Sequence, residues 1–362
     1  MKYDYIFISN TPSFYKINLY NELCRHLSIK VYFIGQSSTI RNQDFCNGTM
    51  NFEYKFINKE SFENRNKLLS FILILKNLAS DSYSYLALPG WEIFELCVLM
   101  CFHPKKKNAI VIESSIRETN LTGFIRLLKK YIVNRCCIAF PSGLLQKDIL
   151  DNLNFNGLTV KTHGVGIINY HNIDENLNNS VNLCCRQNSN QLKKSYKFKY
   201  LYVGRLSEEK NLVFLINVFN NLKKDLTIVG DGPQMLLLKN IAENNIKFLG
   251  YVDNINLKKI YCEHDIFILP SISEPWGLVI DEAIYFNLPV IVSNNVGCVD
   301  DMVTSGKTGV DFQYDSSRSL ISSIINMENN YLNFYNNVLN FSFTDRDRKQ
   351  LNSYLSIFNK SS

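Results

Sequence analysis

Short runs of β-branched and aromatic residues alternate with stretches of helical periodicity along the whole chain. Apolar runs predict strands in the first half at 3–9, 30–34, 83–88, 109–113 and 137–140, and in the second half at 198–203, 226–229, 247–249, 266–269 and 290–292. Apolar positions spaced by three and four predict helices at 14–27, 91–102, 124–134, 144–153, 316–328 and 348–358. In the second half, a helix of ordinary length is also expected before each of the four strands from 226–229 onward. Such alternation is typical of an α/β protein built on parallel sheets.

One stretch interrupts this pattern. Residues 170–196 are polar, rich in Asn and aperiodic, which predicts a linker. A chain of 362 residues is long for one core and suits two domains. We therefore expect a first domain at 1–169, a second domain at 197–340 and a helical tail at 341–362. Two doubly wound domains in tandem are expected to bind a ligand in a cleft between them.

The composition is that of a folded protein, with 46% hydrophobic and 20% charged residues. The longest largely apolar stretches, at 68–75 and 97–102, are far shorter than the roughly 20 residues that cross a bilayer. Residues 1–9 suit a first strand better than a cleaved signal sequence. The ten cysteines include adjacent pairs but no Cys-x-x-Cys, so we expect reduced thiols, no metal site and a cytoplasmic location.

Positive charge is concentrated in the first half of the chain. Residues 1–165 contain 20 Lys and Arg against 13 Asp and Glu, whereas the remainder contains 19 against 20. A basic half can bind an acidic substrate, an anionic membrane surface or nucleic acid, or it can be a solvated surface. The clustered cations are Lys105, Lys106, Lys107, Arg126, Lys129 and Lys130.

A glycine and two cations follow the strand at 198–203. Gly204 lets the backbone turn tightly where this strand ends. Arg205 and Lys210 come next and suit the oxygens of a diphosphate, although alone they could be two solvated charges in a loop. The following strand ends at Gly230-Asp231-Gly232-Pro233. Met235 stands where a dinucleotide fingerprint has its last glycine, so we interpret this run as a turn.

Two carboxylates bracket a strand–helix junction further along the chain. Glu274 follows the strand at 266–269 in the run Glu-Pro-Trp-Gly, and Glu282 lies about a turn inside the next helix. Free N–H groups from Gly277 through Leu278 to Val279 predict an anion site at the start of that helix. Carboxylates accept hydrogen bonds from sugar hydroxyls, although an acidic pair alone is often structural. Turns at the same edge of the sheet are expected at Gly297, Gly306 and Gly309.

Six runs occur in a fixed order along residues 198–310. They read Gly-Arg-Leu-x-x-x-Lys, Gly-Asp-Gly-Pro, Phe-Leu-Gly-Tyr-Val, Leu-Pro-Ser-x-x-Glu-Pro-Trp-Gly-Leu-Val-x-x-Glu-Ala, Leu-Pro-Val-Ile-x-Ser and Gly-x-x-Gly. Together they resemble the retaining glycosyltransferases of family 4. The resemblance implies the GT-B fold, in which two Rossmann-like doubly wound domains face a central cleft. It also implies a nucleotide-sugar donor site that needs no metal and no other cofactor.

The resemblance also implies a role for each matching residue of the second domain. Arg205 and Lys210 would bind the diphosphate and, together with Glu274, would be the catalytic residues. Glu274 would bind the donor sugar, Glu282 the ribose, and Gly277 and Leu278 the phosphate and sugar through their backbone. The other donor-site residues are Gly204 and Val279, with Tyr251 and Val252 where the family holds the nucleobase. The Asp-x-Asp triplet at 345–347 lies in the tail and is not expected to bind a metal.

The first domain carries fewer of the family's features. The loop after its first strand, at 10–16, lacks the usual glycines. Glu113-Ser114-Ser115, with Lys129-Lys130 and Pro141-Ser142-Gly143, resembles a subset of bacterial surface-polysaccharide transferases. Glu113 is therefore a candidate for acceptor or catalytic contact, or else a buried structural carboxylate. His163 is a second acceptor-side candidate, although a single histidine is more often structural.

The resulting hypothesis is a retaining hexosyltransferase acting on a nucleotide-diphosphate sugar. Its acceptor would be a glycan on a lipid diphosphate, such as an O-antigen or capsule repeat unit, at the inner face of a bacterial membrane. The basic first domain would then face anionic lipid, and nucleic acid is not expected as a partner. A non-catalytic sugar-binding or scaffold subunit and a nucleotide-sugar epimerase of the same architecture are the alternatives.

Overall fold

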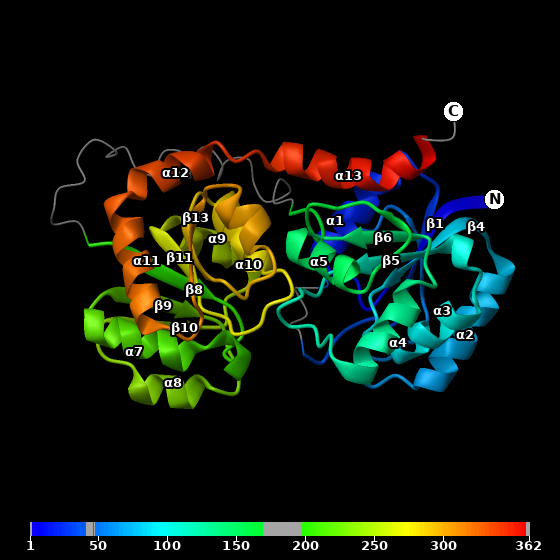
Figure 1. Ribbon diagram of the computed structural model, residues 1–362. Helices are drawn as coiled ribbons and strands as arrows, with labels where there is room; N and C mark the ends of the chain where they lie inside the picture. Colours follow the sequence, from blue (N-terminus) through cyan, green and yellow to red (C-terminus); the bar gives the residue numbers. More distant parts are fainter. Residues whose placement is uncertain (1, 41–45, 47, 169–196, 360–362) are drawn as a thin grey trace. The chain divides into compact units, whose positions relative to one another are not determined.

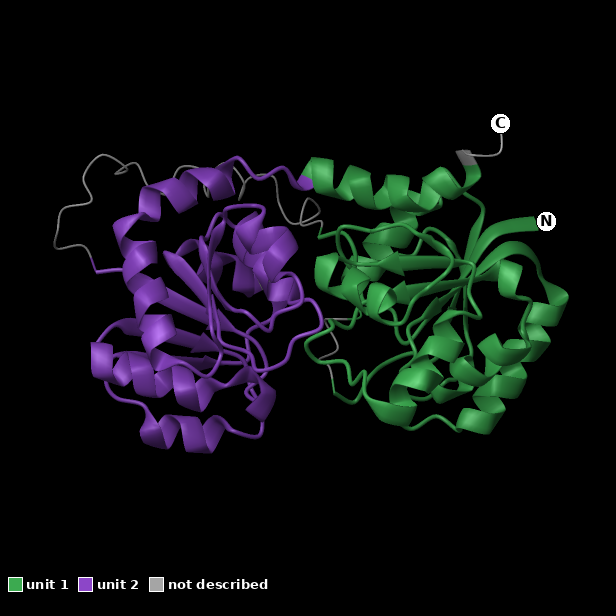
Figure 2. Cartoon of the chain, in the orientation of Figure 1, with its two compact units in different colours: residues 1–169, 344–362 green, residues 170–343 purple. Residues whose placement is uncertain are grey.

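The computed structural model describes residues 2–40, 46, 48–168 and 197–359, and the chain divides into two compact units. Unit 1 comprises Met1–Asn169 together with Thr344–Ser362, and unit 2 comprises Tyr170–Phe343 (Figures 1 and 2). The linker predicted at 170–196 lies outside the described residues. Each unit contains one parallel sheet with helices packed on it, which confirms the predicted α/β class.

Unit 1 is built on a seven-stranded sheet with the order β3-β2-β1-β4-β5-β6-β7, and its paired strands are parallel. Its strands are β1 (Lys2–Ser9), β2 (Ile29–Phe33), β3 (Glu53–Phe56), β4 (Ser82–Pro89), β5 (Asn108–Ile112), β6 (Ile138–Pro141) and β7 (Leu158–Thr159). The chain moves outward from β1 to β3 and then returns to β4 on the other side of β1. The strand order therefore reverses between β1 and β4, the position where open α/β sheets bind ligands.

Helices cover both faces of this sheet. They are α1 (Phe14–Leu23), α2 (Lys67–Ser80), α3 (Phe94–Phe102), the short η2 (Lys105–Lys107), α4 (Gly123–Val133), α5 (Leu144–Asn152) and α13 (Phe343–Asn359). Alternate residues of β1 point to opposite faces, so the core divides into two clusters. One cluster contains Ile74 of α2, Leu99 of α3 and Val133 of α4. The other contains Ile17 of α1 and Tyr354 of α13.

The last helix, α13, packs on unit 1 although it follows unit 2 in the sequence. The Tyr5 hydroxyl donates to the carbonyl of Tyr354 at 3.2 Å, and the rings of Phe140 and Tyr354 lie 4.6 Å apart. The Gln350 side chain donates to the Gly164 carbonyl at 2.8 Å. The helical tail predicted at 341–362 thus contains α13, which the structure groups with the first sheet.

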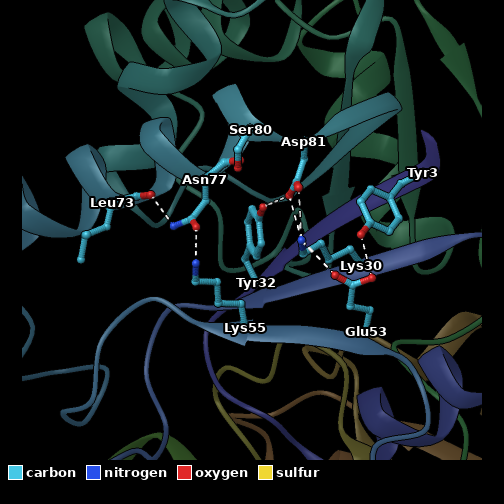
Figure 3. Close-up of polar contacts among 9 residues, drawn as sticks. All are labelled: Tyr3, Lys30, Tyr32, Glu53, Lys55, Leu73, Asn77, Ser80 and Asp81. Atoms are coloured by element: carbon cyan, nitrogen blue, oxygen red, sulfur yellow. Dashed lines mark hydrogen bonds and ion pairs between the residues drawn. The ribbon is translucent and has the colours of Figure 1, made fainter. Parts of the chain in front are cut away.

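A polar network joins the first three strands of unit 1 to the end of α2 (Figure 3). Lys30 Nζ lies 3.0 Å from a Glu53 oxygen and 3.1 Å from an Asp81 oxygen. The Tyr3 hydroxyl donates to Glu53 at 2.7 Å, and the Tyr32 hydroxyl donates to Asp81. Tyr3, Lys30 and Glu53 lie at the amino ends of their strands, and Asp81 directly precedes β4. Because ligands bind at the carboxyl ends in such sheets, we interpret the network as structural.

Unit 2 is built on a six-stranded parallel sheet with the order β10-β9-β8-β11-β12-β13. Its strands are β8 (Lys199–Val203), β9 (Asp225–Val229), β10 (Ile246–Gly250), β11 (Ile266–Leu269), β12 (Val290–Ser293) and β13 (Gly309–Phe312). Its helices are η3 (Glu208–Lys210), α7 (Leu212–Leu222), α8 (Met235–Ile241), α9 (Asn254–Cys262), α10 (Leu278–Tyr285), η4 (Val299–Thr304), α11 (Ser317–Asn329) and α12 (Tyr331–Leu339). The strand order reverses between β8 and β11.

Some strands and helices were not predicted from the sequence. The strands β3, β7 and β13 and the helices α2 and α12 were not predicted. The turn expected at Gly309 is wrong, because this glycine begins β13 and pairs with Val290 of β12. Gly297 and Gly306 do lie in turns, as expected.

Candidate functional site

All but two of the predicted donor-site residues of the second domain follow two adjacent strands. β8 and β11 pair with each other at the switch point of unit 2. The loop after β8 carries Arg205 and Lys210, and the loop after β11 carries Glu274. The Ile272 N–H donates to the Glu209 carbonyl at 2.8 Å, so main chain also joins the two loops. The topology thus brings together residues that lie 64 positions apart in the sequence.

Lys210 and Glu274 form an ion pair across these two loops. The Lys210 ammonium contacts Oε2 of Glu274, and the Ser271 hydroxyl lies 3.5 Å from the same oxygen. Each of the two charged side chains is 16% exposed. The pair is therefore shielded enough to be ordered and still reachable by a ligand. Its ammonium can bind a phosphate oxygen, and its carboxylate can accept a sugar hydroxyl.

Close backbone packing holds the loop that carries Arg205. The Leu206 N–H donates to the Asp231 carbonyl at 2.9 Å, and the Gly230 N–H donates to the Gly250 carbonyl at 2.8 Å. Gly230 has a φ of 131°, and a Cβ at this position would lie 1.9 Å from the carbonyl oxygen of Gly204. The Gly-Asp-Gly-Pro turn therefore packs directly against the loop that carries Arg205, and only glycine at position 230 permits this close approach.

Three other predicted donor-site residues lie near the solvent. The Arg205 side chain is exposed, and its carbonyl accepts a hydrogen bond from the Tyr202 hydroxyl at 2.9 Å. Tyr251, 47% exposed, and Val252 follow β10, which is separated from β8 by β9. Their assignment to a nucleobase stays a prediction.

A helix begins directly beside Glu274. α10 starts after Gly277, whose φ is 97° and where a Cβ would lie 2.8 Å from Cγ1 of Val296. The Gly297 N–H donates to the Glu274 carbonyl at 2.9 Å, which anchors the preceding loop. Leu278 and Val279 form the first turn, where N–H groups have no partner within the helix. Such a turn binds anions through its N–H groups and the helix dipole.

Glu282 lies inside α10 and is 6% exposed. Its Oε2 accepts a hydrogen bond from the Tyr261 hydroxyl of α9 at 2.9 Å. The neighbouring Asp281 accepts from Nε1 of Trp276 at 2.8 Å, which ties the helix to its preceding loop. A contact between Glu282 and a ribose stays a prediction. The partner Tyr261 was not identified from the sequence, because it lies outside every motif.

In unit 1, Glu113 follows β5 and forms an ion pair with Lys16 in the first turn of α1. The Lys16 side chain is 15% exposed and that of Glu113 is 33% exposed. Burial acts to lower the pKa of Lys16, but the Glu113 carboxylate and nearby tyrosines raise it above its ordinary value. Burial also raises the pKa of Tyr20 to about 12. Lys16 is therefore a fixed cation at the carboxyl edge of the first sheet, and no motif in the sequence identified it as a site residue.

His163 occupies a tight turn after β7. Its φ is 60°, in the left-handed region that few side chains adopt. The Thr162 hydroxyl donates to the Gly164 carbonyl at 2.9 Å, and this carbonyl also accepts from Gln350 of α13. The turn is thus fixed by the last helix. A role of His163 toward an acceptor stays a prediction.

The described ranges contain no group of three His, Cys, Asp or Glu side chains that could hold a metal ion. The triplet at 345–347 lies in α13, where Arg346 pairs with Asp347 at 2.9 Å. Burial raises the pKa of Asp347, with Arg346 opposing it. Metal independence stays a prediction.

The two doubly wound sheets identify the class of protein by their architecture. The chain has the GT-B fold. It covers 99% of sucrose-phosphate synthase from Thermosynechococcus elongatus over 99% of its own length, with a TM-score of 0.71 and 15% sequence identity. It matches Anabaena HepE in complex with UDP over 99% of both chains, with a TM-score of 0.65 and 15% identity. At such identities the likeness shows the fold alone.

Sequence comparison is more specific for the second half of the chain. Residues 186–340 match the family model described as glycosyl transferases group 1, so the chain carries a group 1 glycosyltransferase domain. An uncharacterized 41.2 kDa protein in the cps region of Klebsiella pneumoniae is 31% identical over 152 residues, or 41% of each chain. The chain spans less than half the length of the first curated relatives that it matches. Both residues of the Lys210–Glu274 pair lie within the matched domain.

Proposed function

We propose that this chain is a retaining glycosyltransferase that moves a hexose-type sugar from a nucleotide-diphosphate sugar to a glycan acceptor. The single observation that carries the proposal is the Lys210–Glu274 ion pair at the switch point of unit 2, beside the first turn of α10. The UDP held by a protein of the same fold supports a nucleotide-linked donor. The relative from a cps region supports an acceptor of the capsule or O-antigen type, carried on a lipid diphosphate at the cytoplasmic face of the membrane.

In this scheme the donor diphosphate binds Arg205, Lys210 and the N–H groups at the start of α10. Glu274 accepts hydrogen bonds from the hexose and holds the Lys210 ammonium in place before the donor arrives. The electrostatic arrangement is thus formed in advance of the reaction, which is what lowers a barrier most effectively. No metal ion and no further cofactor take part.

The transfer itself requires one bond to break and one to form. The bond between the anomeric carbon and the diphosphate oxygen breaks, and negative charge develops on the departing diphosphate. The acceptor oxygen bonds to the same face of that carbon, and its proton passes to the departing oxygen. The cations meet the developing charge, so no protein nucleophile is needed. In unit 1, the Glu113–Lys16 pair offers a carboxylate and a cation for the acceptor.

A donor screen followed by a transfer assay tests the proposal. Thermal shifts with UDP-, GDP- and ADP-sugars identify the donor, and product NMR then gives the anomeric configuration. Release of nucleoside diphosphate should require an added acceptor, which distinguishes transfer from epimerisation. Arg205→Ala should lower turnover by about 10²–10³-fold. Lys223→Ala is the matched control, since this exposed cation lies before β9, at the amino end of the sheet.

Two results would overturn the proposal. Turnover of Arg205→Ala at the level of Lys223→Ala would remove the diphosphate site from the loop after β8. A product with inverted anomeric configuration would rule out the retaining mechanism while leaving glycosyl transfer intact.

A further inference from the structure

Helix α4 carries its apolar stripe on the outside of unit 1. Phe124, Leu127, Leu128 and Tyr131 follow the spacing i, i+3, i+4, i+7, which places them on one face of the helix. Their exposed fractions are 77, 60, 48 and 55%. In a helix that covers a sheet, this stripe ordinarily packs on the core. In α4, by contrast, the apolar stripe points away from the core of unit 1.

α4 is attached to the rest of unit 1 by hydrogen bonds from two cationic side chains and by two buried apolar residues. Arg126 donates to the Asn152 carbonyl at 2.8 Å, and Lys129 donates to the Asn120 carbonyl at 3.1 Å. Only Ile132 and Val133, at the end of the helix, are buried. These hydrogen bonds and the two buried residues attach α4 to unit 1 with its apolar stripe facing outward.

The neighbouring helices extend the apolar surface. α3 packs against both α2 and α4, and the three helices lie on one face of the first sheet (Figure 1). On α2, Leu68 is 69% exposed and Ile72 is 52% exposed. On α3, Phe102 is 82% exposed. Large exposed apolar side chains on three neighbouring helices are typical of a surface that contacts a membrane or another protein.

The charge around this surface selects between those partners. Residues 94–135 contain eight Lys and Arg against three Asp and Glu. Two of the three carboxylates, Glu95 and Glu113, are already paired, with Arg65 at 2.6 Å and with Lys16. The three lysines of η2 are exposed in the same segment. A second copy of the chain would bring like charge against like charge, whereas an anionic bilayer supplies acyl chains for the stripe and phosphates for the cations.

We propose that α4, with the outward apolar residues of α2 and α3, is a docking surface for an anionic lipid bilayer. α4 has 11 residues, so it lies in the headgroup region parallel to the membrane and does not cross it. The surface belongs to unit 1 and shares no residue with the donor site of unit 2. The inference rests on the membrane-borne acceptor of the proposed function, whereas sugar transfer itself is tested separately by the donor assay and does not depend on this surface.

Vesicle flotation with the full chain tests this surface. The vesicles contain phosphatidylcholine alone or phosphatidylcholine mixed with phosphatidylglycerol. Wild type should float with the mixed vesicles, less so at high salt because the phosphate contacts are screened. F124S/L128S should bind at least about tenfold more weakly than wild type, because two apolar side chains no longer enter the interface. L236S/L237S is the matched control, since these residues of α8 in unit 2 are 74 and 49% exposed.

Three results would overturn the proposal. The first is that wild type does not float with the mixed vesicles. The second is that F124S/L128S floats as well as L236S/L237S. Alternatively, analytical ultracentrifugation would find wild-type dimers that F124S/L128S converts to monomers, which would make a second copy the occupant. Unchanged circular dichroism and an unchanged thermal shift with the donor establish that both variants are folded.

Discussion

Replacing Lys210 with methionine tests the centre of the candidate site. Methionine keeps most of the length of the lysine stem and removes its charge. The variant leaves the Glu274 carboxylate, 16% exposed, without its ion-pair partner. Loss of a partner from a partly shielded charge costs about 1–2 kcal/mol of the free energy of unfolding. Loss of a cation that meets charge developing in the reaction costs about 3–4 kcal/mol of the activation free energy, or about 10²–10³-fold in turnover.

The same unit offers a matched control. Lys224 pairs with Glu328 at 2.7 Å, and the two side chains are 28 and 22% exposed. This lysine precedes β9 at the amino end of the sheet, whereas Lys210 follows β8 at the carboxyl end. Lys224→Met should therefore lower the free energy of unfolding by a similar amount, about 1–2 kcal/mol, with less than about a twofold change in turnover.

Two measurements separate the effects on folding and on turnover. Urea denaturation gives the free energy of unfolding for both variants, and acceptor-dependent release of nucleoside diphosphate gives kcat and KM. The loss in Lys210→Met should lie mainly in kcat, because the ammonium acts most strongly on the departing diphosphate. If Lys210→Met and Lys224→Met lower turnover equally, the ion pair at the switch point is structural and the reasoning is refuted.

Three further expectations concern stability. Gly230→Ala should cost about 2–4 kcal/mol of the free energy of unfolding, because its Cβ would lie 1.9 Å from the Gly204 carbonyl oxygen. Gly250→Ala, with open space around it, should cost about 1 kcal/mol, and equal losses would refute the clash. Burial lowers the pKa of His264 below its ordinary 6.5, so the unfolded chain binds the proton more readily and melting temperature should fall as pH drops below about 6.5; His264→Gln should flatten that slope. Lys30→Met should cost about 1–2 kcal/mol in urea denaturation, because the Glu53 and Asp81 carboxylates lose their shared cation and keep only tyrosine hydroxyls as partners. A smaller loss at pH 7 than at pH 4 would contradict this.

Local sequence was sufficient where burial determines the pattern. Strands such as β5 and β11 are apolar along their length because helices cover both faces of the sheet. The edge strand β3 has the pattern Glu-Tyr-Lys-Phe with three exposed residues, so no apolar run marks it, and its pairing with β2 makes it a strand. α2 was missed for the opposite reason, since apolar residues on its outer face obscure the helical period.

The candidate site was predictable only in part. The motifs identified Lys210 and Glu274 separately, because each follows a strand with the right residue types nearby. Their contact depends on β8 lying beside β11, which long-range topology decides and no local pattern records. Lys16 shows the same limit more strongly. It is a single lysine in a helix, and it becomes a candidate site residue because it pairs with Glu113, 97 residues away.

The placement of α13 constrains the order in which the chain becomes native. Unit 2 is complete once residue 343 has been made, whereas unit 1 still lacks the helix that covers Tyr5 and Phe140. During synthesis from the amino end, the first sheet therefore keeps one aromatic face open while the whole of unit 2 is produced. A chain truncated before α13 would retain every residue of the donor site and leave that face permanently uncovered. Completion of the last helix is thus the step at which unit 1 buries this aromatic face.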